Sequence, residues 1–511
     1  MQSTKSGKSR GLIINWDCTE WFVSRPAEKM TVAGLQALVD QYVGTQVSTI
    51  FFNPTSQRTA YASKVRESFW DGNEKVNNAL VKNTRLLHER GIDPYQVSIA
   101  RCREKGISPW LSMRMNDLHN TEDPNSYIHN SFWRKHPEFR RVPGSKRPYG
   151  DQALDYAIKE VRDYQMAAVR ELLERYDPDG LELDWMRSFY HFKPGHEKEG
   201  VQIALDFMRQ VRQLADEWAQ RRGHPIKLAA RVPAVPEHAR GFGLDGVAWA
   251  RAGVVDILVP TPFWETADFD IPVDRWRELL GPHADKVVLA AGMEGNIRGC
   301  PRPSIAIVND SETMRGFTAA MLERGADQIY LFNHFSTPGS EGRGRIYHEA
   351  GRLETVLDKP RRHMVTFHDT VPPGVVRTAL LPSVLRHPTV PGQFRIYTGP
   401  ALDKGTVTLR IGLAERPGVD EAILAARLNS VACKPLADNA NLDSFPQAKR
   451  VRQSMSAPRR ATMTATAVKR VLQFAAPVAS LQRGHNLVEV FLTEVTEQTI
   501  VWVEVYIVPD A

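Results

Sequence analysis

Eight short apolar runs, each followed by a segment with helical periodicity, occupy the first two thirds of this 511-residue chain. Near-continuous apolar runs of this kind indicate parallel strands that are buried on both faces, because the intervening helices cover the sheet. Eight strand–helix units in about 350 residues fit a (β/α)₈ barrel with some long loops. The runs lie at residues 11–17, 48–54, 107–117, 179–187, 226–232, 255–265, 286–294 and 326–334.

The segments between the runs predict helices, because apolar residues recur there at spacings of three and four. A polar and aromatic loop from about residue 117 to 150 interrupts the alternation, and loops of this length in a compact domain are usually functional. A doubly wound open sheet is the alternative fold, but no Gly-x-Gly-x-x-Gly turn follows the first strand. The predicted helices cover 31–43, 75–90, 96–105, 151–176, 201–221, 244–252, 273–280, 313–324 and 344–358.

From about Val365 the pattern changes to short runs separated by turn signals, without a long helical period. Such a pattern is typical of an all-β domain, and a two-sheet sandwich is the expected form. The predicted strands cover 394–398, 406–413, 422–428, 468–474, 487–493 and 500–508. We therefore predict a polar N-terminal tail over residues 1–10, a barrel domain over 11–362 and a β-sandwich domain over 363–511.

Composition excludes several classes of protein. With 42% hydrophobic and 24% charged residues the chain is globular, and no apolar run approaches the roughly 18 residues of a membrane span. The net charge of +7 is modest and no nucleic-acid motif is present, so neither a membrane nor a nucleic acid is an expected partner. Residues 1–10 lack the apolar core of a signal peptide, which implies either an intracellular protein or a removed leader. The four cysteines lie far apart and predict no disulfide framework.

The fourth run contains two acids in a strand, Glu182 and Asp184. Because side chains alternate across a strand, both carboxyl groups point to one face and the apolar residues between them point to the other. Burying two carboxyl groups side by side is costly without a purpose. One of them can pair with an arginine such as Arg187 in a purely structural role, but we expect at least one to be functional.

Polar residues stand at the end of nearly every predicted strand, where a barrel of this kind carries its working residues. A packed core would not need this convergence, so we predict a polar pocket. The candidates at the strand ends are Asn15, Asp17, Asn53, Arg114, Asn116, Glu182, Asp184, Arg231, Glu265, Glu294, Asn333 and His334. His119 and Arg187 join them from the adjoining loops. Trp185 and Trp264 are further candidates, because an aromatic ring can serve as a platform for the face of a sugar ring.

Acid chemistry is the expected function of this pocket, since glycoside hydrolysis needs two carboxyl groups on either side of the scissile bond. The best-placed acids are Asp184, Glu294 and Glu265. We predict Asp184 as nucleophile or base and Glu294 as proton donor, with Glu265 in reserve. Glu182 is expected one layer deeper, where it would hold Arg114 or Arg231.

Other functions stay open at this stage. A metal could gather His119, His191, His196 and His334 with nearby acids, but no metal-binding spacing supports it, and no metal or cofactor is predicted. No Gly-x-Ser-x-Gly elbow indicates a serine nucleophile. A carbohydrate-binding protein with a degenerate, non-catalytic barrel is the main rival, and a metal-dependent hydrolase or isomerase is the other. The arginines near the pocket suggest an acidic or sulfated glycan.

The stretch Asp179-Gly180-Leu181-Glu182-Leu183-Asp184-Trp185-Met186-Arg187 resembles the fourth-strand segment of glycoside-hydrolase-like (β/α)₈ barrels of the family 10-like or uncharacterised glycosyl hydrolase type. Retaining families similar to α-amylases and α-galactosidases carry a nucleophilic aspartate at this strand end, where Asp184 matches. Their acid/base lies on a later strand, where Glu265 or Glu294 stands. The chain lacks both the Asn-Glu pair of the clan with two glutamates and the full amylase signature, so the resemblance implies the class and leaves substrate and linkage open.

Overall fold

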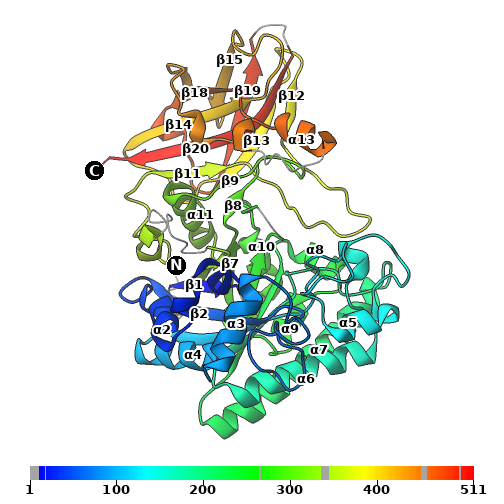
Figure 1. Cartoon of the computed structure of the whole chain (residues 1–511). Helices are drawn as coiled ribbons and strands as arrows, with labels where there is room; N and C mark the ends of the chain where they lie inside the picture. The colour runs from blue at the N-terminus through cyan, green and yellow to red at the C-terminus, as the bar shows by residue number, and fades with distance from the viewer. Residues whose placement is uncertain are drawn as a thin grey trace.

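The computed structural model describes residues 11–17, 19–263, 266–334, 344–450, 457–493 and 497–510. They form a closed barrel of eight parallel strands surrounded by helices, followed by two antiparallel sheets (Figure 1). The predicted polar tail, together with Trp264 and Glu265, lies outside the described residues. In the described part of the chain, no helix has the length and apolar character needed to cross a membrane.

The barrel strands overlap the eight predicted runs, which confirms the (β/α)₈ fold and excludes the open sheet. Around the barrel the order is β1-β10-β7-β6-β5-β4-β3-β2, and every neighbouring pair is parallel. The strands are β1 Leu12–Trp16, β2 Val47–Thr55, β3 Ser108–Arg114, β4 Gly180–Asp184, β5 Lys227–Pro233, β6 Ile257–Thr261, β7 Val288–Met293 and β10 Gln328–Phe332.

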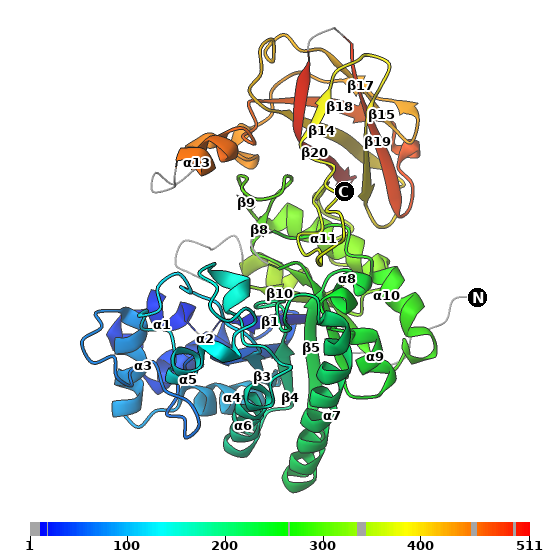
Figure 2. The same ribbon diagram turned by 90° about the vertical axis from the view of Figure 1, so that its right-hand side faces the viewer.

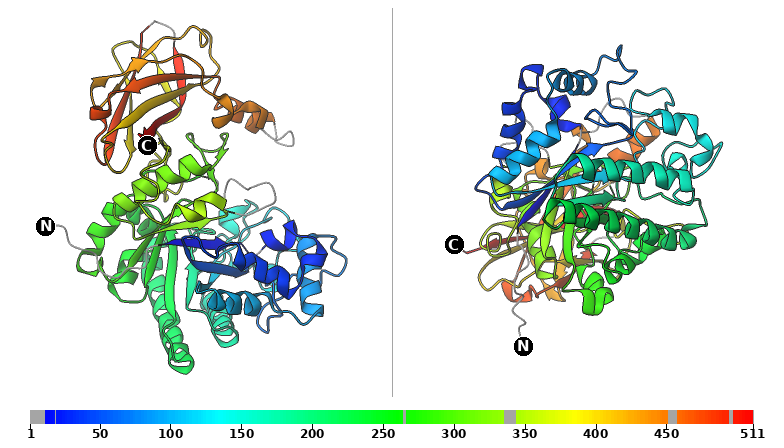
Figure 3. Two further views of the ribbon diagram at one scale, coloured as in Figure 1. Left: turned by 90° about the vertical axis from the view of Figure 1, so that its left-hand side faces the viewer. Right: turned by 90° about the horizontal axis from the view of Figure 1, so that it is seen from below.

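Helices surround these strands (Figure 3). Local sequence sets some of their starts: the Asp93 side chain accepts hydrogen bonds from the Tyr95 and Gln96 amides, and Pro94 occupies the first turn of α4. The helices are α1 Glu20–Ser24, α2 Val32–Asp40, α3 Ala79–Glu89, α4 Pro94–Glu104, α5 Ser131–Lys135, α6 Lys159–Arg175, α7 Glu197–Arg222, α8 Pro236–Gly241, α9 Gly246–Arg251, α10 Val273–Leu280 and α11 Ser311–Glu323.

One predicted helix is wrong. After Gly344, the segment up to residue 358 contains a one-turn 3₁₀ helix, Arg345–His348, followed by turns instead of a continuous α-helix. Gly351 lies in the middle of this segment and donates its amide hydrogen to Gln46 Oε1 at 2.6 Å. A glycine favours helix poorly, and here a contact with a distant part of the chain replaces the helical hydrogen bond.

Aromatic side chains fill the lower part of the barrel interior. The rings of Phe51 and Trp110 stack with centroids 4.7 Å apart. Trp110 occupies the space that a side chain at position 180 would need, since a Cβ on Gly180 would lie 2.5 Å from its ring. Because interior positions recur every second residue, Glu182 and Asp184 stand one and two layers above this apolar floor.

The C-terminal part forms the predicted all-β sandwich. One sheet has the order β11-β20-β14-β18-β17, with β12 paired to β20, and the other has the order β13-β19-β15-β16. A short helix that was not predicted, α13 Ala457–Thr464, precedes β18. The strands are β11 Arg361–Met364, β12 Ser383–Leu385, β13 Gly392–Tyr397, β14 Gly405–Leu413, β15 Leu424–Leu428, β16 Val431–Ala432, β17 Lys434–Pro435, β18 Arg470–Ala476, β19 His485–Leu492 and β20 Gln498–Pro509.

The sandwich and the barrel meet along α11 and along a hairpin that follows β7 (Figure 2). Strand β11 crosses α11 so closely that a Cβ on Gly316 would lie 1.8 Å from the Arg362 carbonyl oxygen. The hairpin, β8 Asn296–Ile297 and β9 Ile307–Val308, brings the Ile305 amide within 3.1 Å of Thr466 Oγ1. The sandwich is therefore packed directly on the barrel.

A buried ion cluster lies in the larger sheet. Glu504 of β20 is fully buried and accepts hydrogen bonds from Arg362 of β11 at 2.6 Å, from Arg410 of β14 at 3.1 Å and from the Trp502 indole at 2.8 Å. Although burial opposes it, the charges of Arg362 and Arg410 lower the pKa of Glu504. The stability that this carboxylate contributes is therefore complete at neutral pH and is lost as the pH falls through its lowered pKa.

Replacing Glu504→Gln should lower the free energy of unfolding at pH 7 by about 3 kcal/mol, because the buried Arg362 and the partly buried Arg410 lose their shared counter-charge. Denaturant titration followed by circular dichroism measures the loss. Glu497→Gln is the matched control: Glu497 also pairs with two arginines, at 3.1 and 3.5 Å, but its side chain is 42% exposed. It should cost less than about 1 kcal/mol. Equal losses in both variants would contradict the assigned role of the cluster.

Candidate active site

The register of the sheet places three charged residues side by side at the carboxyl end of the barrel. Arg114 of β3 is paired with Asp184 of β4, and Asp184 with Arg231 of β5. All three side chains are buried, and Arg231 and Asp184 completely so. Because neighbouring strands run parallel, the residues that end them lie at one level. The polar residues at the ends of β3, β4 and β5 therefore lie side by side, as predicted.

Asp184 is held by N–H donors on two sides. Arg231 Nη1 lies 3.1 and 3.2 Å from its two oxygens, and the backbone amides of Met186 and Arg187 donate to Oδ1 at 3.0 and 2.9 Å. The loop after β4 thus wraps around the carboxyl group that ends the strand. Donors of this kind suit a charged carboxylate.

Arg231 also reaches the second predicted catalytic acid. Its Nη2 atom lies 3.4 Å from Glu294 Oε1, and its guanidinium stands over the Phe332 ring at 3.6 Å from the centroid. Glu294 follows β7 and is 2% exposed. One buried guanidinium, seated on an aromatic ring of β10, therefore joins the carboxyl groups that end β4 and follow β7.

The two acids differ in their surroundings. Burial raises the pKa of Glu294 to about 8, although the charges of Arg231 and Arg187 act in the opposite direction. Glu294 is therefore a protonated acid at neutral pH, able to donate its proton. Asp184, by contrast, is surrounded by hydrogen-bond donors.

Glu182 lies one layer deeper, as predicted, but the prediction that it holds Arg114 or Arg231 is wrong. Its Oε2 atom accepts hydrogen bonds from Asn15 Nδ2 at 3.2 Å, from the Ser112 hydroxyl and from the Tyr330 hydroxyl at 3.0 Å. Within the described residues its Oε1 atom has no hydrogen-bond partner. Burial, and then the charge of Asp184, raise the pKa of Glu182, so it is a second neutral acid beneath the first pair.

A second cluster joins the ends of β1 and β3 to the loops beyond them. Arg114 pairs with Asp17 and, at 2.8 Å, with Asp117, and Asp117 accepts a hydrogen bond from His119 Nδ1 at 2.6 Å. Arg187 donates to His119 Nε2. Although burial opposes it, the charges of Arg114 and Arg187 lower the pKa of Asp17 to about 2. We call these five residues, Asp17, Arg114, Asp117, His119 and Arg187, the mouth cluster.

Two of the predicted substrate-binding residues make contacts that hold the structure together. Trp185 is fully buried outside the barrel wall, where it packs against Tyr156 and Trp249, because its position in the strand has the opposite parity to Asp184. The Asn116 amide donates to the carbonyl groups of Leu154 and Tyr190, both at 3.1 Å, and thereby ties two loops together. Trp185 thus faces away from the barrel interior, whereas Asn116 also lines a small cavity together with Arg114 and Asp117.

The remaining predicted residues are polar and close to strand ends. Asn15 lies in the layer of Glu182, and Asn53 is 1% exposed. The side-chain oxygens of Asn53 and Asn333 have no hydrogen-bond partner among the described residues. Asn333 follows β10 with a positive φ of 56°, and His334 is 4% exposed.

Some residues of the site were not predicted. Ser112 and Tyr330 hold Glu182, and their parity within β3 and β10 could have revealed them. Asp369 lies near enough for its charge to act on Glu294, but it comes after β11, beyond every barrel strand, where no strand-end rule applies.

Among the histidines considered for a metal, His191 contacts Asn116 and Trp185 instead. In the described ranges, no three side chains of the metal-binding types gather in a suitable arrangement.

Comparison with known proteins gives similarity at the level of architecture. No family model and no curated protein sequence matches the chain. Among solved structures, α-L-fucosidase isoenzyme 2 from Paenibacillus thiaminolyticus is similar over 70% of this chain at 14% identity, with a TM-score of 0.44; the match spans 51%, about half, of that protein. The PgaB (BpsB) glycoside hydrolase domain from Bordetella bronchiseptica matches 67% of this chain and 99% of its own length, at 9% identity and a TM-score of 0.41. The match to an α-L-fucosidase from Vibrio sp. strain EJY3 covers 98% of this chain and 97% of that protein, at 12% identity and a TM-score of 0.36.

Proposed function

We propose that this chain is a glycoside hydrolase that uses Asp184 and Glu294 as its two carboxyl groups. The observation that carries the proposal is the position of Arg231, which contacts both acids at the carboxyl end of the barrel. The two groups differ in their surroundings, since burial raises the pKa of Glu294 to about 8 while Asp184 accepts hydrogen bonds from N–H donors on two sides. One neutral acid and one carboxylate are the groups that glycosidic cleavage requires.

In the proposed reaction Glu294 transfers its proton to the glycosidic oxygen as the bond to the anomeric carbon breaks. The positive charge that develops on the sugar ring is stabilised by the Asp184 carboxylate. Asp184 then either bonds to the anomeric carbon, which gives a covalent intermediate, or takes a proton from the attacking water. Arg231 orients both groups and, once Glu294 has lost its proton, balances the new negative charge.

The mouth cluster is our candidate for substrate binding, together with Asn15, Asn53, Asn333 and His334. His119 and Arg187 are its partly exposed members. Arg114 and Arg231, which suggested an acidic or sulfated glycan, each pair with two carboxyl groups.

Asp184→Asn and Glu294→Gln should each lower kcat/KM by a factor of about 10²–10⁴, because each removes a group that acts on the reacting bond. The assay is a hydrolysis screen of aryl glycosides and glycans that covers neutral, amino and acidic sugars. Asp179→Asn is the control, since Asp179 comes just before β4, at the opposite end of the strand. It should retain parental activity. Loss with Asp184→Asn alone would reject Glu294 as proton donor, and binding of glycans without turnover would favour a carbohydrate-binding protein.

The value of kcat/KM should decrease as the pH rises through about 8, because Glu294 must carry a proton to act as the acid. Well below pH 8 nearly all Glu294 side chains carry the proton, so kcat/KM should be constant there. Above pH 8, each further pH unit should lower kcat/KM about tenfold. Glu182 also has a raised pKa, so the pH profile is measured beside Glu182→Gln. The decrease should persist in this variant; its disappearance would assign the titration to Glu182.

A further inference from the structure

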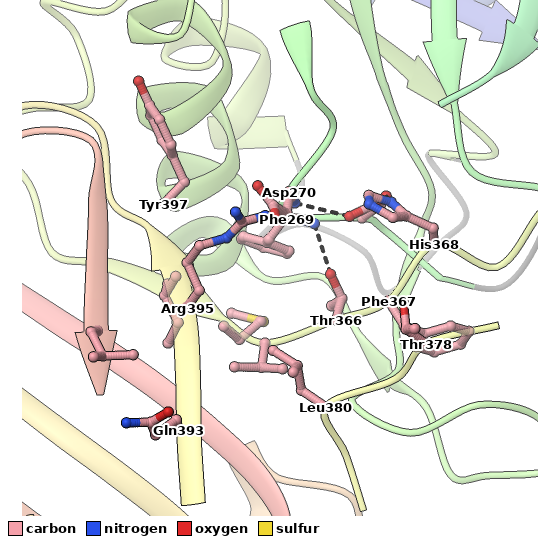
Figure 4. A pocket seen from close by; sticks show the side chains of 15 residues that line it. Phe269, Asp270, Thr366, Phe367, His368, Thr378, Leu380, Gln393, Arg395 and Tyr397 are labelled. Atoms are coloured by element: carbon pink, nitrogen blue, oxygen red, sulfur yellow. Dashed lines mark hydrogen bonds and ion pairs between the residues drawn. The ribbon is translucent and has the colours of Figure 1, made fainter. Parts of the chain in front are cut away.

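A cavity of about 280 Å³ lies where the sandwich packs on the barrel. Its walls come from residues 268–270 in the loop after β6, from residues 364–368 at the end of β11 and beyond it, and from β13 and β19 (Figure 4). Among the described residues that line it, none ends a barrel strand. The volume is close to the lower limit of small-molecule sites, roughly 300 Å³, so the cavity suits a small ligand.

The sandwich wall of the cavity is the outer face of two paired strands. Phe394 of β13 is buried in the sandwich, while Gln393 and Arg395 on either side of it are exposed, because side chains alternate along a strand. The register of the sheet pairs Arg395 with Leu487 of β19 on the same face. This wall therefore presents an amide, a guanidinium and an apolar side chain next to one another.

His368 contributes a charged ring to the opposite side of the cavity (Figure 4). Its Nδ1 atom lies 2.5 Å from Oδ2 of the fully buried Asp268. The charge of Asp268 raises the pKa of His368 to about 9, so the contact is an ion pair at neutral pH. In the described part of the chain the Nε2 atom of His368 has no hydrogen-bond partner, which leaves one donor for a ligand.

Arg395 supplies further donors. Its Nη2 atom donates to Asp270 at 2.7 Å, and its side chain is 60% exposed. The guanidinium makes no other hydrogen bond to the described residues, so its remaining N–H groups are available. Asp270 also contacts Arg324, which has a second carboxylate partner in Asp274.

The charges that line the cavity are balanced. Two of the lining side chains are carboxylates, Asp268 and Asp270, and two are cations, His368 and Arg395. A charged ligand would therefore lose its hydration without gaining a counter-charge. A neutral ligand with hydroxyl groups can accept from the available N–H groups and donate to a carboxylate, so the balance favours this kind of ligand.

Apolar side chains form the rest of the lining. Met364, Val365 and Phe367 are buried, whereas Leu380 is 45% exposed. Small-molecule sites combine such apolar walls with a few polar groups that fix the orientation of the ligand. A pyranose ring has matching chemistry, because it carries C–H groups on its faces and hydroxyl groups around its rim.

We propose that this cavity binds one neutral sugar unit of a glycan. His368 and Arg395 donate hydrogen bonds to its hydroxyl groups, and Asp270 accepts one in return. Leu380 covers the C–H groups of one ring face. The choice of a sugar rests in part on the proposed function, whereas the cavity and its donors do not. A sugar held here adds affinity for a glycan without contacting the scissile bond.

The test is NMR of protein with ¹³C-labelled Met, Leu and Val methyl groups, titrated with the methyl β-glycosides of glucose, galactose, N-acetylglucosamine and glucuronic acid. The signals of Met364 and Leu380 are assigned by their loss in Met364→Ile and Leu380→Ile. At least one neutral glycoside should shift both signals, and the glucuronide should bind more weakly than the glucoside.

Arg395→Ala should raise the dissociation constant about tenfold or more, because hydrogen bonds from a charged group to the ligand are lost. Arg386→Ala is the matched control. Arg386 is also an exposed arginine of the sandwich, paired with Glu497 at 3.1 Å, but it does not line the cavity, so binding should be unchanged.

If Arg395→Ala does not fold, Leu380→Glu takes its place, since a charge on the apolar wall should weaken binding by a similar factor. Its control is Val390→Glu, because Val390 is 63% exposed and lies outside the cavity lining. Equal affinities in these two variants would contradict the proposal.

Absence of shifts at Met364 and Leu380 with every neutral glycoside would overturn the inference, and so would equal affinities in Arg395→Ala and Arg386→Ala. Tighter binding of the glucuronide than of the glucoside would overturn the assignment of a neutral ligand. Binding of a neutral glycoside here, in a protein that hydrolyses no glycoside, would support the site and reject the proposed function, so the two failures are distinguishable.

Discussion

The buried guanidinium of Arg231 is the constraint on which the site depends. An arginine without solvent must have its charge compensated and its hydrogen bonds made, or the fold loses several kcal/mol. Here Asp184 lies against the guanidinium as its ion-pair partner, the carboxyl group of Glu294 accepts a hydrogen bond from it, and its flat face rests on Phe332. The three strands that carry the charged groups are therefore held at one level, with both acids directed at the same point.

The layers beneath this point explain why the acids can be so completely buried. Trp110 and Phe51 close the lower barrel, and Gly180 leaves room for the indole. Glu182 occupies the next layer as a neutral acid whose Oε2 atom is bonded by side chains from β1, β3 and β10. A neutral group at this depth avoids a second negative charge under Asp184, which would cost stability at short distance.

Much of this arrangement follows from the period of two in the strands. That period predicts the barrel, the common face of Glu182 and Asp184, and the meeting of β4, β5 and β7 at one end. It also places Trp185 on the outer face, so its burial among helices is a consequence of the same rule. Contacts between distant segments could not be predicted in this way. The partners of Glu182 come from strands at both ends of the barrel sequence, Asp369 comes from beyond it, and Gly351 breaks an expected helix through a contact with Gln46.

The most direct test of the two-acid account compares Glu294→Gln with the parent on aryl glycosides whose leaving groups differ in acidity. A poor leaving group needs the proton from Glu294 as the bond breaks, whereas a strongly acidic phenol departs without it. The account predicts a loss of about 10²-fold or more for the poor leaving group and a much smaller loss for the acidic phenol. An equal loss for both would show that Glu294 does not donate the proton, and the assignment of the pair held by Arg231 would then be wrong.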